Sequence, residues 1–195
     1  MKKISLLVLL SVVAFNVVSA EISDDTQKRI AENRQLVKEL FAALKGELGK
    51  ALEAGGPAAA IPVCKSRVPE IGKIFEEKYP GWTIGRTSLK TRNPVNAPDE
   101  WERPVLQGFE ARKAAGEDPK AMEHSAFLEK DGVRVFRYMK AIPTQEVCIL
   151  CHGKQLIPDV VAKLEELYPE DQARGFEVGD IRGAFSFMQP APARN

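Results

Sequence analysis

The feature that most constrains this chain is the run Cys148-Ile149-Leu150-Cys151-His152. Two thiols three positions apart, followed at once by an imidazole, form the attachment signature of a c-type haem. The thiols can add to the two vinyl groups of one haem, and the histidine can ligate the iron. The run therefore predicts one covalently attached haem c, bound through Cys148 and Cys151, with His152 as an axial ligand of the iron.

Three other interpretations of the two thiols compete with haem. They could form half of a zinc site together with Cys64 and a histidine, a thioredoxin-like redox pair, or a structural disulfide. A zinc site does not require a histidine directly after the second cysteine, and a redox pair is expected at the end of a βαβ strand, which this stretch lacks. A disulfide that closes so short a loop removes little entropy from the unfolded chain. The motif favours haem over all three.

The N-terminus has the pattern of a secretory signal peptide over residues 1–20. Lys2 and Lys3 precede a short apolar stretch, and small residues end the segment at Ala20. We expect cleavage before Glu21 and a mature protein in the periplasm, where covalent haem attachment takes place. The apolar stretch is short for an uncleaved membrane anchor, so we expect no contact with the membrane after cleavage.

Composition limits the function of the mature chain, residues 21–195. Removing Lys2 and Lys3 from 28 basic residues leaves a net charge of −1 against 27 acidic residues, so no basic surface for nucleic acid is expected. The length suits one domain with a core of its own. The cysteine count is three, which leaves Cys64 as an unpaired thiol once the haem thiols are assigned.

Apolar periodicity and turn residues predict four helices. The first begins at Ser23, carries an apolar stripe to Leu52 and ends at Gly55-Gly56-Pro57. A short helical segment or turn over 58–64 leads to a second helix over 69–77. The others span about 99–115, with Asp99 as the cap, and about 158–167.

Alternating residues predict four strands. Two of them, 125–130 and 133–142, are joined at Asp131-Gly132, a dipeptide suited to a tight hairpin turn. In the second, even-numbered apolar residues from Phe136 share one face, so we expect the hairpin to bury one side against the haem-bearing core. The remaining strands span 82–88 and 183–188, and Gly183 suits a close backbone approach.

Several further residues are candidates for the haem site. Arg86 and Arg92 could neutralise the haem propionates and Asn93 could hydrogen-bond them, although all three could equally hold a loop by bonding backbone groups. Methionine and histidine are common as the sixth iron ligand of c-type cytochromes, and spacing alone favours a methionine here. The candidates are Cys64, Met122, His124, Met139 and Met188.

The chain resembles the PAS-like c-type haem family, which includes small exported monohaem proteins and sensor regions of histidine kinases. The resemblance implies an α+β fold in a single domain, with an antiparallel sheet flanked by helices. It also implies iron held by His152 on one side and by Cys64 on the other. Pro62 departs from the helix-compatible residue expected before Cys64. The matching runs are residues 60–64, 86–88, 92–102, 148–153 and 179–184.

These expectations combine into a periplasmic monohaem c-type cytochrome for electron transfer or redox sensing. Its partner would be a redox or signalling protein. The alternatives are a sensor that binds a diatomic gas, a haem peroxidase-type enzyme and a haem-free zinc module. An enzyme is disfavoured, because His124 is the one histidine left for distal acid-base work and no paired carboxylates stand out.

Overall fold

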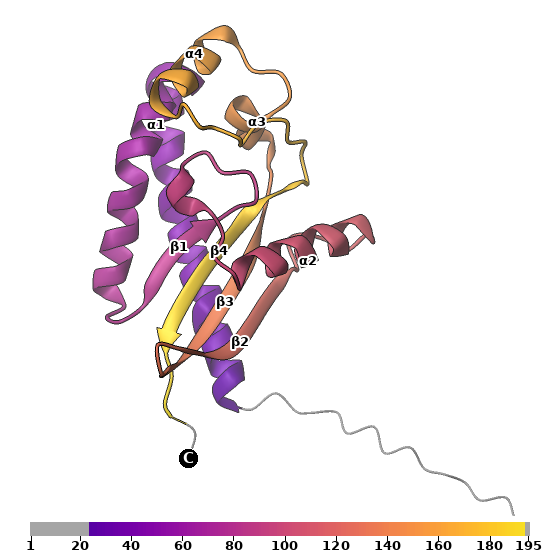
Figure 1. Ribbon diagram of the computed structural model, residues 1–195. Coiled ribbons are helices and arrows are strands. Elements are labelled where there is room, and N and C mark those ends of the chain that lie inside the picture. Colours follow the sequence, from indigo (N-terminus) through magenta and orange to yellow (C-terminus); the bar gives the residue numbers. More distant parts are fainter. Residues whose placement is uncertain (1–23, 194–195) are drawn as a thin grey trace, which may run out of the picture.

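The computed structural model describes residues 24–193, so the predicted signal peptide lies outside the described residues. Within this range no helix combines the length and apolar character needed to cross a membrane. The elements form a single α+β domain (Figure 1). In chain order they are α1 (Asp24–Lys78), β1 (Thr83–Thr87), the 3-10 turn η1 (Pro94–Asn96), α2 (Glu102–Ala114), β2 (Glu123–Lys130), β3 (Val133–Pro143), α3 (Glu146–His152), α4 (Pro158–Leu167) and β4 (Ile181–Pro190).

The four strands form one antiparallel sheet in the order β1-β4-β3-β2. The expected strands and the Asp131-Gly132 hairpin are confirmed: both turn residues have positive φ, 53° and 76°, as a two-residue hairpin turn requires. The close backbone approach predicted at Gly183 is also confirmed. A Cβ at this position would lie 2.3 Å from the carbonyl oxygen of Thr87 on the neighbouring strand.

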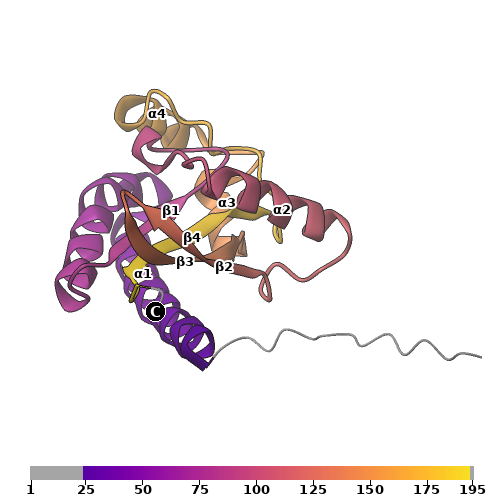
Figure 2. The ribbon, with the colours of Figure 1, turned by 60° about the horizontal axis from the view of Figure 1, so that its bottom comes forward.

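Helix α1 folds back on itself at Gly55 and Gly56, whose backbone angles leave the helical region. The two arms lie side by side along one face of the sheet (Figure 2), and the Lys78–Glu39 ion pair of 2.6 Å joins them. Glycine is suited to this bend because Gly56 has a φ of 73°. The predicted stop at Gly55-Gly56-Pro57 is confirmed as the bend between the arms.

The second arm corrects one expectation from the sequence. It runs without a break through Pro62 and Pro69, where a turn and then a separate helix were predicted. A proline inside a helix removes one backbone hydrogen bond, which is why the sequence indicated an interruption. Ile61 is only 3% exposed and packs with Val160 and Leu164 of α4, and this burial stabilises the arm despite the prolines.

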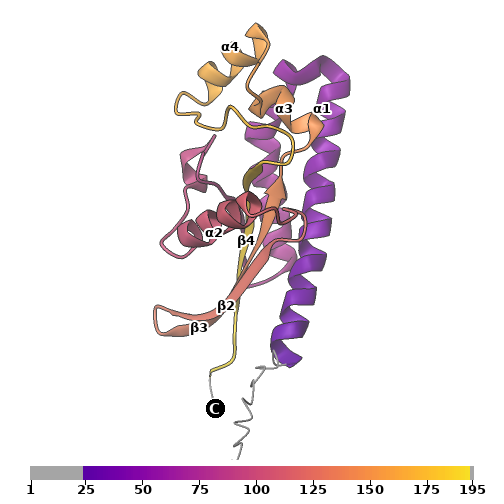
Figure 3. The same cartoon turned by 90° about the vertical axis from the view of Figure 1, so that its right-hand side faces the viewer.

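Both faces of the sheet are covered, which corrects the expectation that the hairpin buries one side. Phe136 and Tyr138 pack beneath α1, whereas Met139 and Ala141 pack beneath α2. Figure 3 shows α1 and α2 on opposite sides of the sheet. α2 begins at Glu102 with Trp101 at the N-cap, three residues after the predicted cap Asp99. Asp99 still serves the helix start, because its Oδ1 accepts hydrogen bonds from the backbone nitrogens of Trp101 and Glu102 at 3.0 and 2.8 Å.

One end of the sheet carries the remaining helices. α3, α4 and the bend of α1 gather there, at the top of Figure 1. α4 follows its predicted bounds, and its buried Val160 and Leu164 meet Ile61 of α1. The seven-residue helix α3 holds the whole cysteine-histidine run, so the fold places this motif where α1, α4 and the start of β4 converge.

Candidate functional site

The two motif thiols and the imidazole are displayed by one helix. Residues three apart lie on the same helix face, so Cys148 and Cys151 of α3 point to one side, and His152 follows about a quarter turn further round. The helix ends directly after His152. The backbone nitrogen of Gly153 donates to the Ile149 carbonyl at 3.0 Å, and a Cβ at residue 153 would lie 2.5 Å from that oxygen.

The His152 ring is oriented by the chain segment before β4. Nδ1 lies 2.8 Å from the carbonyl oxygen of Ala173, which can only accept, so Nδ1 carries the proton and donates. The backbone nitrogen of Phe176 also donates to the His152 carbonyl at 3.0 Å. Nε2 therefore carries the lone pair, as in a metal-ligating histidine, and Arg182 Nε lies 3.5 Å from it.

Arg182, at the start of β4, lies against the same ring. Its Nε is 3.2 Å from Nδ1 and 3.5 Å from Nε2 of His152, and its Nη1 donates to Ser88 Oγ at 3.0 Å and to the Lys90 carbonyl at 3.1 Å. Burial, followed by the charges of Arg182 and Arg92, holds the pKa of His152 well below its usual value. Burial and the neighbouring arginines Arg92 and Arg86 lower the pKa of Arg182 to about 10.

Arg92 holds the loop that contains Ala173. It donates to the Cys151 carbonyl at 2.5 Å and to the Ala173 carbonyl at 3.3 Å, and it pairs with Asp171 at 3.1 Å. Asp171 also pairs with Arg174 at 2.9 Å. Burial alone would raise the pKa of Asp171, but the hydrogen bonds from Arg92 and Arg174 outweigh it and lower the pKa. Arg92 therefore holds a loop through backbone carbonyls, which was the alternative to neutralising a haem propionate.

Asn93 also holds a loop, whereas Arg86 does not. Asn93 Oδ1 accepts from the backbone nitrogen of Val95 at 3.2 Å and caps η1, which is again a loop-holding contact. Arg86 shares the α1 face of β1 with Ile84, two positions away. Within residues 24–193 its guanidinium has no hydrogen bond or ion pair. Burial lowers the pKa of Arg86, and the Cys64 thiol opposes that effect. Arg86 is therefore a half-buried cation available to an anion.

Cys64 lies on the second arm of α1, near the end of α4. The adjacent Lys65 donates to the Leu167 carbonyl at 2.8 Å, which ties this stretch to α4. Burial raises the pKa of the Cys64 thiol, while Arg86 and Arg92 pull it down. Burial also raises the pKa of Cys151, and Cys64 adds to that rise. The fold thus brings Cys64 within electrostatic reach of Cys151 and of both arginines.

The other candidate iron ligands have different surroundings. Met122 and Met139 are fully buried beneath α2, and His124 is exposed, with its ring centroid 5.7 Å from that of Trp101. Met188 pairs with Thr83, six positions along β4 from Arg182, which corresponds to about 20 Å of extended strand. None of these four packs in the cluster that contains Cys151.

Apolar space borders the motif. A cavity of about 370 Å³ separates the first arm of α1 from the start of α3, and Leu48, Leu52 and Val147 contribute its apolar wall. Val147 directly precedes Cys148.

The three cysteines of the chain are free thiols rather than a disulfide. Within the described residues, no three His, Cys, Asp or Glu side chains are grouped as a metal site, the arrangement that the zinc alternative needs.

Reasoning from the sequence missed Arg182 and Asp171. Arg182 lies in residues 179–184, a run that contributed to the family resemblance, but nothing in its spacing indicated contact with His152. Asp171 had no local signal. Its role depends on Arg92, 79 positions earlier in the chain, and only the fold brings the two side chains together.

Fold and site together define a single-domain α+β protein whose Cys-x-x-Cys-His helix faces a third cysteine and three arginines. The chain belongs to the Tll0287-like family, whose model, described as Tll0287, matches residues 14–190.

A solved structure shares the fold. It is the crystal structure of the cyanobacterial haem-protein Tll0287, with 22% sequence identity and a TM-score of 0.63. The similarity covers 86% of this chain and 98% of that one. No match was found among the curated proteins.

Proposed function

We propose that this protein is a monohaem c-type cytochrome, with haem attached through Cys148 and Cys151 and iron held by His152 and Cys64. The observation that carries the proposal is the His152 imidazole on the same short helix as the two thiols, with Nδ1 donating to the Ala173 carbonyl and the lone pair left on Nε2. Membership of the Tll0287-like family supports it, because the solved Tll0287 is described as a haem protein.

The residues present fit such a group. Cys148 and Cys151 are free for thioether bonds, and Arg86 offers an unpaired guanidinium to a propionate or to the Cys64 thiolate. The cavity beside the start of α3 offers apolar surface from Leu48, Leu52 and Val147 next to the motif. When bound, haem supplies one-electron chemistry between ferric and ferrous iron.

The chain's own groups would control that chemistry. The Ala173 carbonyl fixes the proton on Nδ1 and so keeps Nε2 aimed as a donor. The Arg92–Asp171 pair holds the loop that carries this carbonyl. Burial raises the pKa of Cys64, and Arg86 and Arg92 oppose that rise. If His152 and Cys64 both held the iron, they would leave no position open for a substrate.

The role that follows is electron transfer or redox sensing in the periplasm, after removal of residues 1–20. Six-coordinate iron favours outer-sphere electron transfer over turnover, which disfavours the peroxidase alternative. The PAS-like family resemblance suits sensing as well, and the output partner would be a separate redox or signalling protein.

Replacement of Cys64 tests the ligand set. A thiolate favours ferric over ferrous iron, so Cys64→Ser should raise the reduction potential and change the low-spin spectrum. Axial ligands set haem potentials across a range of about 0.8 V, so we expect a rise on the order of 100 mV. The measurement is a spectroelectrochemical titration of the exported protein.

Met139→Leu and Met188→Leu are matched controls that remove the rival sulfur donors. Both should leave the potential and the spectrum unchanged. If Cys64→Ser behaves like wild type while one methionine variant shifts, the assignment of Cys64 is wrong and that methionine is the ligand.

A further inference from the structure

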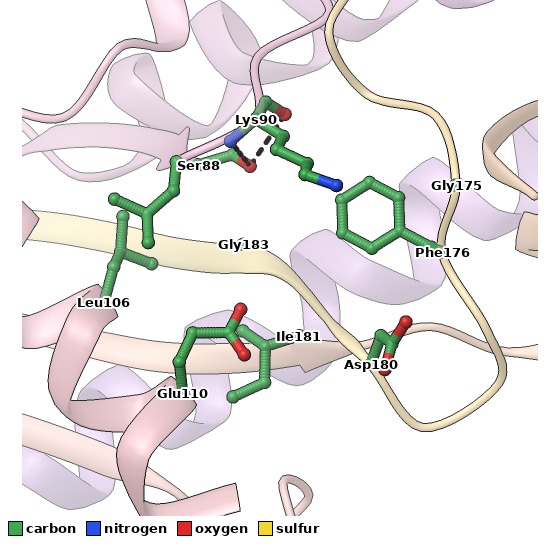
Figure 4. Close-up of a pocket in the computed structure, with 10 residues that line it drawn as sticks. Ser88, Lys90, Leu106, Glu110, Gly175, Phe176, Asp180, Ile181 and Gly183 are labelled. Carbon is green, nitrogen blue, oxygen red and sulfur yellow. Dashed lines mark hydrogen bonds between the residues drawn. The ribbon is translucent and has the colours of Figure 1, made fainter. Parts of the chain in front are cut away.

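A second cavity, of about 270 Å³, lies between α2, the loop after β1 and the loop before β4 (Figure 4). None of the cysteines lines it, and neither do His152, Arg86 or Arg92, so it is separate from the proposed haem contacts. Its walls carry both apolar and charged side chains. The apolar residues are Leu89, Leu106, Phe176 and Ile181, and the charged residues are Lys90, Glu110 and Asp180.

Lys90 and Glu110 are the charged side chains of the cavity without a direct ion pair in the described chain. Neither the ammonium of Lys90 nor the carboxylate of Glu110 makes a hydrogen bond or ion pair within residues 24–193, although Lys90 Nζ lies 5.3 Å from the centroid of the Phe176 ring. Asp180, which also lines the cavity, differs, because Lys113 pairs with it at 2.5 Å. Burial raises the pKa of Glu110, and Lys113 and Lys90 oppose that rise.

In the part of the chain that the structure describes, the Lys90 ammonium and the Glu110 carboxylate make no direct ion pair, and both border one partly apolar cavity. They are complementary to a ligand that carries both charges on a hydrocarbon body. We propose that this cavity binds a small zwitterion, a free amino acid with an aliphatic side chain. Its ammonium pairs with Glu110 and its carboxylate with Lys90, while its side chain contacts Leu106 and Ile181. Both charged residues are reached by solvent, so a ligand can reach them too.

The same walls contact the haem-binding histidine, which gives the site a regulatory role that rests on the proposed function. The Phe176 ring meets the His152 ring edge to face, with centroids 6.3 Å apart and planes at 89°. The Lys90 carbonyl accepts a hydrogen bond from Arg182, and Arg182 contacts the His152 ring. A ligand held by Lys90 against Phe176 therefore acts on the surroundings of the iron ligand.

Calorimetric titration of the full exported protein with L-leucine tests the site. We expect saturable binding, with 4-methylpentanoate and 3-methylbutylamine, which each keep one of the two charges, binding more weakly by about tenfold or more. Glu110→Gln and Lys90→Met should each weaken leucine binding by a similar factor. Glu100→Gln and Lys120→Met, which remove exposed charges outside the cavity, should not.

The proposal is overturned if leucine does not bind at millimolar concentration, if the analogues with one charge bind equally well, or if both cavity variants bind like wild type. Circular dichroism checks the fold of each variant, and should one fail to fold, the other decides. A shift of the visible spectrum or the potential on saturation supports the link to His152, and binding without a shift overturns that link. Binding to a protein shown to carry no haem would contradict the proposed function and leave the zwitterion site standing.

Discussion

Asp171 offers a direct test of how the His152 loop is held. Its side chain is 1% exposed, pairs with Arg92 and Arg174, and accepts a hydrogen bond from the backbone nitrogen of Ala173 at 3.0 Å. Asp171→Asn keeps the shape but removes the charge. Arg92, whose side chain is 14% exposed, would then remain buried without its counter-ion.

Removing one partner of a buried ion pair costs about 3–5 kcal/mol, because the other charge stays desolvated. The asparagine amide oxygen can still accept one hydrogen bond, so we expect a loss near the lower limit, about 3 kcal/mol. The loss should appear in the free energy of unfolding from urea titration, with the slope against urea unchanged.

Glu166→Gln on α4 is the matched control. It removes the same charge from the exposed pair of Glu166 with Lys163, in which the side chains are 58% and 36% exposed. Exposed pairs contribute about 0–1 kcal/mol, so this variant should unfold almost like wild type. A loss below about 1 kcal/mol in Asp171→Asn would refute the reasoning, because solvent would then compensate Arg92 as it does Lys163.

Two further predictions concern the sheet. Gly183→Ala should lower the free energy of unfolding by about 1–3 kcal/mol, because its Cβ would meet the Thr87 carbonyl oxygen at 2.3 Å. Gly85→Ala on β1 is the control. Its Cβ would have its nearest contact at 3.9 Å, so it should lower the free energy of unfolding less. Burial alone would raise the pKa of Glu123, but hydrogen bonds from Arg34 and Tyr138 lower it. The ionised carboxylate therefore stabilises the folded state fully above the unfolded pKa of about 4, and this stabilisation is lost as pH falls through the lower folded pKa. Unfolding titrations at stepped pH should show a shallower acid slope in Glu123→Gln, and an unchanged slope would contradict this.

Local signals predicted much of the fold. Asp131-Gly132 specified the hairpin and its register because a two-residue turn with positive φ allows few alternatives. Gly55-Gly56 specified the bend of α1 for a related reason. In both places the conformation depends on the residues at that point and on little else.

Features that depend on distant contacts were missed. The second arm of α1 is helical through Pro62 because α4, about 100 residues later, buries Ile61. Coverage of both sheet faces depends on where α2 packs, which alternation within a strand does not reveal. The seven-residue α3 is too short for helical periodicity to indicate.

The candidate site also combines features that are local in the sequence with features that depend on tertiary packing. The spacing of Cys148, Cys151 and His152 is local and was read directly from the sequence. Arg86 was a candidate from residue chemistry, whereas Cys64 was favoured as the iron ligand only through the family resemblance. Tertiary packing brings both near that helix. Arg182 escaped prediction, since its contact with the His152 ring joins residues 30 positions apart.

Intact mass under denaturing conditions tests the central claim most directly. The protein should be expressed with its N-terminal segment in a host that has haem-attachment machinery, and the periplasmic product weighed. We predict a chain that begins at Glu21 and carries the added mass of one haem, because thioether bonds through Cys148 and Cys151 survive unfolding. A product with the mass of the bare polypeptide would contradict the account.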